Sequence, residues 1–102
     1  METTYNGWTN YATWRVNLEM FDGMTVDDLD FTVDGMDKVR EGIELAMFLE
    51  NYVDDFISES AHGLALGYAQ AFLSDVNWGE IARHLLDAYC EQHPDTYVED
   101  AA

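Results

Sequence analysis

The segment Asp30–Glu41, DFTVDGMDKVRE, has the residue types and spacing of a calcium-binding loop. Five of its residues match positions 1, 3, 5, 6 and 12 of an EF-hand, where oxygen ligands surround the ion and glycine makes the sharp turn: Asp30, Thr32, Asp34, Gly35 and Glu41. Two features depart from the EF-hand pattern. Asp37 stands at a position that is normally apolar, and the residues before Asp30 do not predict a helix. We therefore expect an acidic loop whose Asp34 caps the following helix, and we keep a calcium-binding module as the alternative.

A second group of potential ligands lies near the C-terminus. Cys90 and His93 are three residues apart, and His84 and Asp87 precede them by one or two helical turns, a set that could gather a zinc ion. A lone cysteine on a helix surface is more often structural, and acidic neighbours disfavour the thiolate that a nucleophile needs. The chain also lacks a glycine-rich phosphate loop and a Ser-His-Asp set. We therefore expect no catalytic residue, no metal and no cofactor.

The most abundant ionisable groups are carboxylates, with 21 Asp and Glu against 4 Lys and Arg, for a formal net charge of -17. A compact chain of this length would have a diameter of about 34 Å and carry about one net negative charge per 2 Å, compared with roughly one per 1.7 Å for duplex DNA. Such self-repulsion destabilises a compact state. It also argues against direct binding to nucleic acid or to a membrane, because both require clustered Lys and Arg.

The carboxylates are concentrated in one part of the chain. Between Asp22 and Glu59 there are twelve Asp or Glu but only Lys38 and Arg40. A rigid array of this kind can imitate nucleic-acid phosphates and steer the protein into a basic cleft. The predicted partner-binding residues are Asp27, Asp28, Asp30, Asp34, Asp37, Glu41, Glu44, Asp54, Asp55 and Glu59. A surface that only confers solubility on a phage accessory protein stays open as the plainer interpretation.

A folded scaffold must position these acids. Hydrophobic residues make up 48% of the chain and aromatic residues 14%, which is too apolar for a disordered acidic tail. The periodicity predicts an all-α fold, a single small domain of about four helices with an acidic loop after the first helix. We expect the helical domain to span residues 1–93 and a flexible acidic tail to span 94–102. One cysteine cannot form an internal disulfide, and no signal or membrane-spanning run is visible, which favours the cytoplasm.

The first two helices are predicted over 10–21 and 36–58. The first should be capped by Thr9 or Asn10 and should bury Tyr11, Trp14, Leu18 and Phe21. The second is expected to be central, with an apolar strip of Val39, Ile43, Ala46, Met47, Val53 and Ile57, widened by Leu45, Leu49, Tyr52 and Phe56. Its solvent side should carry Asp37, Glu41, Glu44, Asn51, Asp55 and Glu59.

The other two helices are predicted over 61–73 and within 75–90. Gly63, Gly67 and Ala71 would give the third helix a smooth face for a close neighbour. In the fourth, Asn77 and Glu80 form a capping-box pattern. Its buried stripe should be Trp78, Ile81, Ala82, Leu85 and Tyr89. The solvent-exposed residues of this helix should be Glu80, Arg83, His84, Asp87 and Glu91.

Two stretches resemble a family of small proteins encoded by tailed bacteriophages. GWTNYATWRVNLEMFDG contains the W-T-N-Y-x-T-W-x-V pattern with which that family opens, and YAQAFLSDVNWGEIARHLL is similar to its closing half. The resemblance covers about a third of the chain and assigns no role to the matching residues, which are Trp8, Thr9, Asn10, Tyr11, Thr13 and Trp14. In size and composition the chain is also similar to phage anti-restriction and anti-CRISPR proteins that act as nucleic-acid mimics.

These resemblances and the acidic array together predict a phage-encoded inhibitor of a host nucleic-acid-binding defence complex. It would act without catalysis, in the host cytoplasm, by acidic mimicry. Its partner would be a basic protein, such as a CRISPR effector subunit or a restriction enzyme. Direct contact with nucleic acid or membrane is not expected, and a homodimer stays open. The opening aromatic cluster would anchor the scaffold while the acids face the partner.

Overall fold

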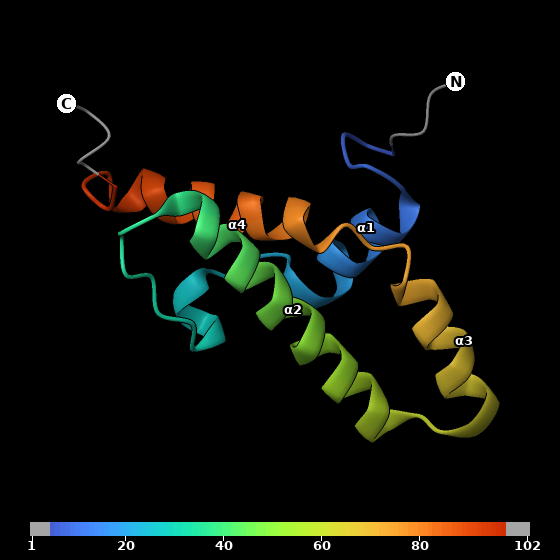
Figure 1. Ribbon diagram of the computed structural model, residues 1–102. Coiled ribbons are helices and arrows are strands. Elements are labelled where there is room, and N and C mark those ends of the chain that lie inside the picture. The colour runs from blue at the N-terminus through green and yellow to red at the C-terminus, as the bar shows by residue number, and fades with distance from the viewer. Residues whose placement is uncertain (1–4, 98–102) are drawn as a thin grey trace.

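The computed structural model describes residues 5–97 (Figure 1). Within that range the chain forms four α-helices, which are α1 (Tyr11–Val16), α2 (Lys38–Ser60), α3 (Gly63–Leu73) and α4 (Trp78–Gln92). A π-helix, η1 (Asn17–Phe21), continues α1, and a 3-10 helix, η2 (Val26–Leu29), lies in the acidic loop. No strand forms between residues 5 and 97. The predicted all-α domain of about four helices is therefore confirmed.

The core lies where α2 packs against α4, which cross in Figure 1. The buried apolar residues of these two helices are Leu45, Leu49, Val53, Ile81, Ala82, Leu85 and Leu86. Phe21 of η1 and Val26 and Leu29 of η2 are also buried in this cluster. The loop that carries many of the predicted partner-binding acids is thus fastened to the core by its own apolar residues.

The first helix has Asn10 as its N-cap, one of the two predicted caps, and the Asn10 side chain accepts a hydrogen bond from the N–H of Thr13. The predicted inward face is wrong in part, because Tyr11 and Leu18 are exposed whereas Phe21 is buried. The buried residues of α1 and η1 are Ala12, Thr13, Val16 and Phe21. The π-helix has i→i+5 hydrogen bonds that widen the turn after Val16, so Leu18 and Phe21 do not continue the stripe that Tyr11 and Trp14 would form on a regular α-helix.

The long helix α2 begins at Lys38, and its N-cap is Asp37 rather than the predicted Asp34. Its buried residues are Glu41, Leu45, Leu49 and Val53. Part of the predicted core strip is wrong, because Val39 is 74% exposed and Ile43 and Met47 are each 59% exposed. Apolar residues occupy two adjacent faces of α2, and α4 covers only one of them. Periodicity alone could not distinguish the two faces.

The last helix, α4, has the predicted N-cap, because the Asn77 side chain accepts a hydrogen bond from the N–H of Glu80. Its buried residues are Glu80, Ile81, Ala82, Leu85 and Leu86. The prediction that Glu80 faces water is therefore wrong. The Glu80 carboxylate accepts a hydrogen bond of 2.9 Å from the N–H of Thr9, which replaces the reciprocal bond of a capping box.

The third helix, α3, forms a hairpin with the end of α2 and lies at one edge of the molecule (Figure 1). None of its residues is buried. The expected close neighbour along the small residues is not found, because a Cβ at Gly67 would meet no atom within 4 Å. The molecule measures 52 × 36 × 22 Å. Among residues 5–97, no helix combines the length and hydropathy needed to cross a bilayer.

The two sequence stretches 7–23 and 68–86 meet through a set of hydrogen bonds that we call the Thr13 latch. The N–H of Asn77 donates to Thr13 Oγ1 at 2.8 Å, and that hydroxyl donates to Asn10 Oδ1 at 2.7 Å. Asn10 Nδ2 in turn donates to the Asp75 carbonyl at 2.8 Å. Thr13 is fully buried, with 0% exposure. The latch holds the start of α1 against the start of α4.

A second set of contacts reinforces the Thr13 latch. The bond from Thr9 to Glu80 lies beside it, and the Trp8 ring stacks on His84 with ring centroids 4.2 Å apart. The motif stretch does anchor the scaffold, but largely through its amide and hydroxyl groups. Tyr11 is exposed and Trp14 is only partly buried, so the aromatic residues contribute less to the core than predicted.

We expect Thr13→Val to lower the free energy of unfolding by about 1–3 kcal/mol. Valine has nearly the same shape as threonine but leaves the N–H of Asn77 without its acceptor. Urea denaturation followed by circular dichroism measures the change. Thr32→Val, at an exposed position in the loop, is the matched control and should stay within about 0.5 kcal/mol of the wild type. Equal effects of the two substitutions would contradict the role of the Thr13 latch.

Candidate partner-binding surface

Glu41, one of the predicted partner-binding residues, is buried, with 1% exposure. Its carboxylate accepts hydrogen bonds from the N–H of Asp34 at 2.6 Å, from the N–H of Gly35 at 3.2 Å and from the Tyr97 hydroxyl at 2.6 Å. Burial, and next the hydrogen bond to Glu41, raise the pKa of Tyr97, so the phenol stays a donor. The prediction that Glu41 faces a partner is wrong, because this residue joins three segments of the chain.

The Tyr97 contact also concerns the predicted C-terminal tail. Residues 94–97 form turns, and the carbonyl of Thr96 lies so close to Gly35 that a Cβ there would approach it to 2.6 Å. Gly35 also has a φ of 75°, which favours glycine. The first part of the predicted tail therefore packs against the acidic loop. Residues 98–102 of that tail lie outside the described residues.

Arg40 neutralises two further predicted partner-binding residues. Its guanidinium donates to Asp34 at 2.9 Å and to Glu44 at 2.9 Å, in two exposed ion pairs. The N–H of Met36, and then Arg40, lower the pKa of Asp34 below its usual value. The Asp37 carboxylate also has a structural role, because it caps the N-terminus of α2. The start of α2 therefore offers a partner less free negative charge than its sequence suggests.

The calcium-binding alternative is not favoured by this geometry. The proposed ligands Glu41 and Asp34 have other partners, and Asp30 lies in a left-handed conformation at the end of η2. Among residues 5–97, no three His, Cys, Asp or Glu side chains come together in a way that could hold a metal ion. Cys90 and His93, the potential zinc ligands, therefore do not form a metal-binding group within residues 5–97. The His93 ring packs against the Tyr89 ring, with ring centroids 4.3 Å apart.

The acidic loop divides its carboxylates between structure and solvent. Asp28 completes a capping box at η2, since it accepts a hydrogen bond of 2.9 Å from the N–H of Thr25. Asp27 and Asp30 are exposed. They therefore remain available to a partner, whereas Asp28 is already engaged.

A different acidic cluster lies at the C-terminal end of α2, and we call it the distal acidic cluster. The cluster consists of Glu50, Asp54, Asp55 and Glu59. The side chains of these residues make no hydrogen bond or ion pair among the described residues. Three of them were predicted, and Glu50 was missed although it lies one turn before Asp54. The cluster begins six residues after Glu44, which is about 9 Å farther along the axis of α2 than the acids that pair with Arg40.

The distal acidic cluster opposes the local stability of its helix. Glu50 and Asp54 form a like-charge i, i+4 pair, as do Asp55 and Glu59, and such pairs are destabilising. No basic residue lies in the last turn of α2, where the negative end of the helix dipole favours cations. Glu50 and Asp54 also line a depression of about 320 Å³ formed by α2, α3 and Trp78 of α4. These carboxylates are accessible and repel one another, so a cationic partner would relieve their repulsion.

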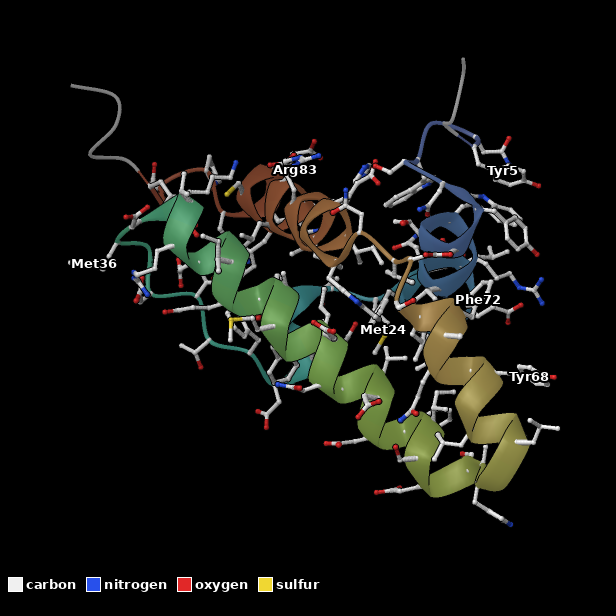
Figure 2. The ribbon with its side chains drawn as sticks, turned by 45° about the vertical axis from the view of Figure 1, so that its right-hand side comes forward. Tyr5, Met24, Met36, Tyr68, Phe72 and Arg83 are labelled. Atoms are coloured by element: carbon white, nitrogen blue, oxygen red, sulfur yellow. The ribbon has the colours of Figure 1, made fainter. Side chains whose placement is uncertain are left out.

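A groove between α2 and α4 was not predicted. It encloses about 580 Å³, and its apolar wall is formed by the part of α2 that was expected to be buried, Val39, Ile43, Ala46 and Met47. The rim carries Lys38, Arg83 and Asp87, and Lys38 donates to Asp87 at 2.8 Å. Figure 2 shows Arg83 on α4, away from α3. The apolar residues of the groove were recognisable in the sequence, but their exposure was not.

Comparison of the chain with models of protein families, with curated proteins and with solved structures found no match.

We expect Tyr97→Phe to lower the free energy of unfolding by about 1–3 kcal/mol, because it removes one donor from the buried Glu41 carboxylate. Thermal and urea denaturation measure the loss. Tyr68→Phe is the matched control, since the Tyr68 side chain is 69% exposed. If both variants unfold like the wild type, the C-terminal segment does not stabilise the fold through Glu41.

The lowered pKa of Asp34 predicts a dependence of stability on pH. The folded state favours the ionised carboxylate, so its contribution is present above the ordinary Asp pKa and is lost as the pH falls below it. The difference in unfolding free energy between wild type and Asp34→Asn should therefore shrink between about pH 5 and pH 2. Asp22→Asn, which changes an exposed carboxylate in the turn after η1, is the control. An equal decrease for both variants would contradict the contribution of Asp34.

Proposed function

We propose that this protein is a non-enzymatic inhibitor that docks its free carboxylates onto a basic, nucleic-acid-binding protein. The observation that carries the proposal is the distal acidic cluster, a set of carboxylates on one rigid helix without a cationic partner among residues 5–97. Its members repel one another and oppose the helix dipole. Their local cost to stability is expected of residues kept for binding rather than for folding.

The spacing of the cluster supports acidic mimicry. The cluster consists of two pairs, Glu50 with Asp54 and Asp55 with Glu59, and the two carboxylates of each pair are four residues, or about 6 Å, apart along the helix axis. One strand of DNA carries a phosphate roughly every 3.4 Å. Asp27 and Asp30 in the loop add exposed charge. A basic groove that binds phosphates would therefore meet several negative charges within a short length of helix, and attraction would speed the encounter.

The resemblance to tailed-phage proteins supports a more specific form of this proposal. The target would be a host defence complex, either a CRISPR effector subunit or a restriction enzyme, encountered in the host cytoplasm. The contact surface would be Asp27, Asp30, Glu50, Asp54, Asp55 and Glu59. Asp28, Asp34, Asp37, Glu41 and Glu44 are omitted because each has a structural partner or lies in the core.

The test is DNA cleavage by purified restriction endonucleases and CRISPR effector complexes, measured with and without the protein. We expect the wild type to inhibit at least one of them and salt to weaken that inhibition, because screening removes the attraction. Neutralising the distal acidic cluster should raise the inhibitory concentration by about 10-fold or more. The variant carries Glu50→Gln, Asp54→Asn, Asp55→Asn and Glu59→Gln.

The matched control removes the same amount of charge from exposed acids elsewhere. It carries Asp22→Asn, Asp75→Asn, Glu91→Gln and Asp95→Asn. This control should inhibit nearly as well as the wild type, because the position of the carboxylates matters and not the net charge alone. Equal inhibition by the two variants, or none by the wild type against any enzyme in the panel, would overturn the proposal.

A further inference from the structure

The outward face of α3 is an apolar surface with nothing packed on it among the described residues. Leu64 and Tyr68 are exposed by 72% and 69%. At Gly67 an added Cβ would meet open space. Figure 2 shows Tyr68 pointing away from α2. Helical spacing places Leu64, Gly67, Tyr68 and Ala71 together on this side, and we call these four residues the α3 face.

The α3 face differs in charge from the rest of the molecule. Residues 60–74 contain no Asp, Glu, Lys or Arg, although the whole chain has 21 acidic residues. A basic partner would find no carboxylate to bind on α3, and an anionic membrane surface would repel a chain with a net charge of -17. An uncharged apolar surface is best covered by another uncharged apolar surface. A second copy of this chain supplies one.

Aromatic residues extend the α3 face toward the N-terminal segment. Phe72 contacts Tyr11, with ring centroids 6.2 Å apart, and Tyr11 contacts Tyr5 at 5.1 Å. Figure 2 shows Tyr5, Tyr68 and Phe72 on the same side of the molecule. The exposed parts of these three residues and Tyr11 amount to about 400 Å². This is about half of the 800 Å² that one partner contributes to a standard interface, before Leu64 and the small residues are added.

We propose that the protein forms a twofold-symmetric homodimer in which α3 packs antiparallel against α3 of a second copy. With the twofold axis between Gly67 and Tyr68, each large residue of one copy lies opposite a small residue of the other. Tyr68 then lies beside Gly67 of the second copy, and Leu64 faces Ala71. Such an interface is self-complementary, and the small residues let the two helix backbones approach closely.

The dimer must also overcome repulsion between two acidic copies. In this arrangement Glu59 of one copy and Asp75 of the other lie near each end of the helix pair. Salt screens this repulsion and strengthens apolar association. Dimerisation should therefore become tighter as salt rises, whereas docking onto a basic partner should become weaker. The two proposals respond to salt in opposite directions and can fail independently, because the dimer needs no partner.

Sedimentation equilibrium of the full chain between about 0.05 and 0.5 M sodium chloride tests the dimer. We expect the wild type to dimerise and Gly67→Leu to weaken dimerisation by about 10-fold or more, because the added side chain clashes with Tyr68 of the second copy. The monomer should still fold, since the position is open and leucine favours a helix more than glycine does. Circular dichroism checks that the helix content is kept.

Two further variants make the result specific. The double variant Gly67→Leu/Tyr68→Ala puts a large side chain opposite a small one again, and we expect it to restore part of the lost affinity. Ser58→Leu adds the same side chain at an exposed position of α2 and should dimerise like the wild type. A wild type that stays monomeric at every salt concentration, or equal dimerisation of Gly67→Leu and Ser58→Leu, would overturn the proposal.

Discussion

Two buried carboxylates connect segments near residues 9 and 97 of this acidic chain to its helical core. Glu41 on α2 receives hydrogen bonds from the acidic loop and from Tyr97, and Glu80 on α4 receives one from Thr9. A buried carboxylate is costly unless hydrogen bonds replace its lost water. The packing of α2 on α4 therefore depends on both terminal segments being in place, because those segments carry the donors.

The acidic residues are abundant, but the structure shows that they have different roles. Some stabilise the fold, as the buried Glu41 does, or pair with the nearest cation, as Asp34 and Glu44 do with Arg40. The distal acidic cluster has neither role among the described residues. The uncharged α3 lies next to that cluster in the hairpin. The molecule thus presents a strongly charged surface beside a neutral one, and partners of different chemistry suit each.

The candidate surface was predictable only in part, for a physical reason. Counting acids along the sequence located Asp54, Asp55 and Glu59, and a one-turn extension would have included Glu50. Counting could not show that Glu41 is buried, because its donors come from positions 34, 35 and 97. It also could not show that Val39 and Ile43 line a groove, since their burial depends on where α4 lies.

The sequence by itself determined the four α-helices and their approximate ends, because capping residues and apolar periodicity act within a few neighbouring residues. Asn10 and Asn77 were identified as caps in this way. Only the tertiary structure decided which face of each helix is buried and which carboxylates stay free. Those outcomes depend on contacts between residues far apart in the chain, such as Thr13 with Asn77 and Glu41 with Tyr97, and local patterns carry no information about them.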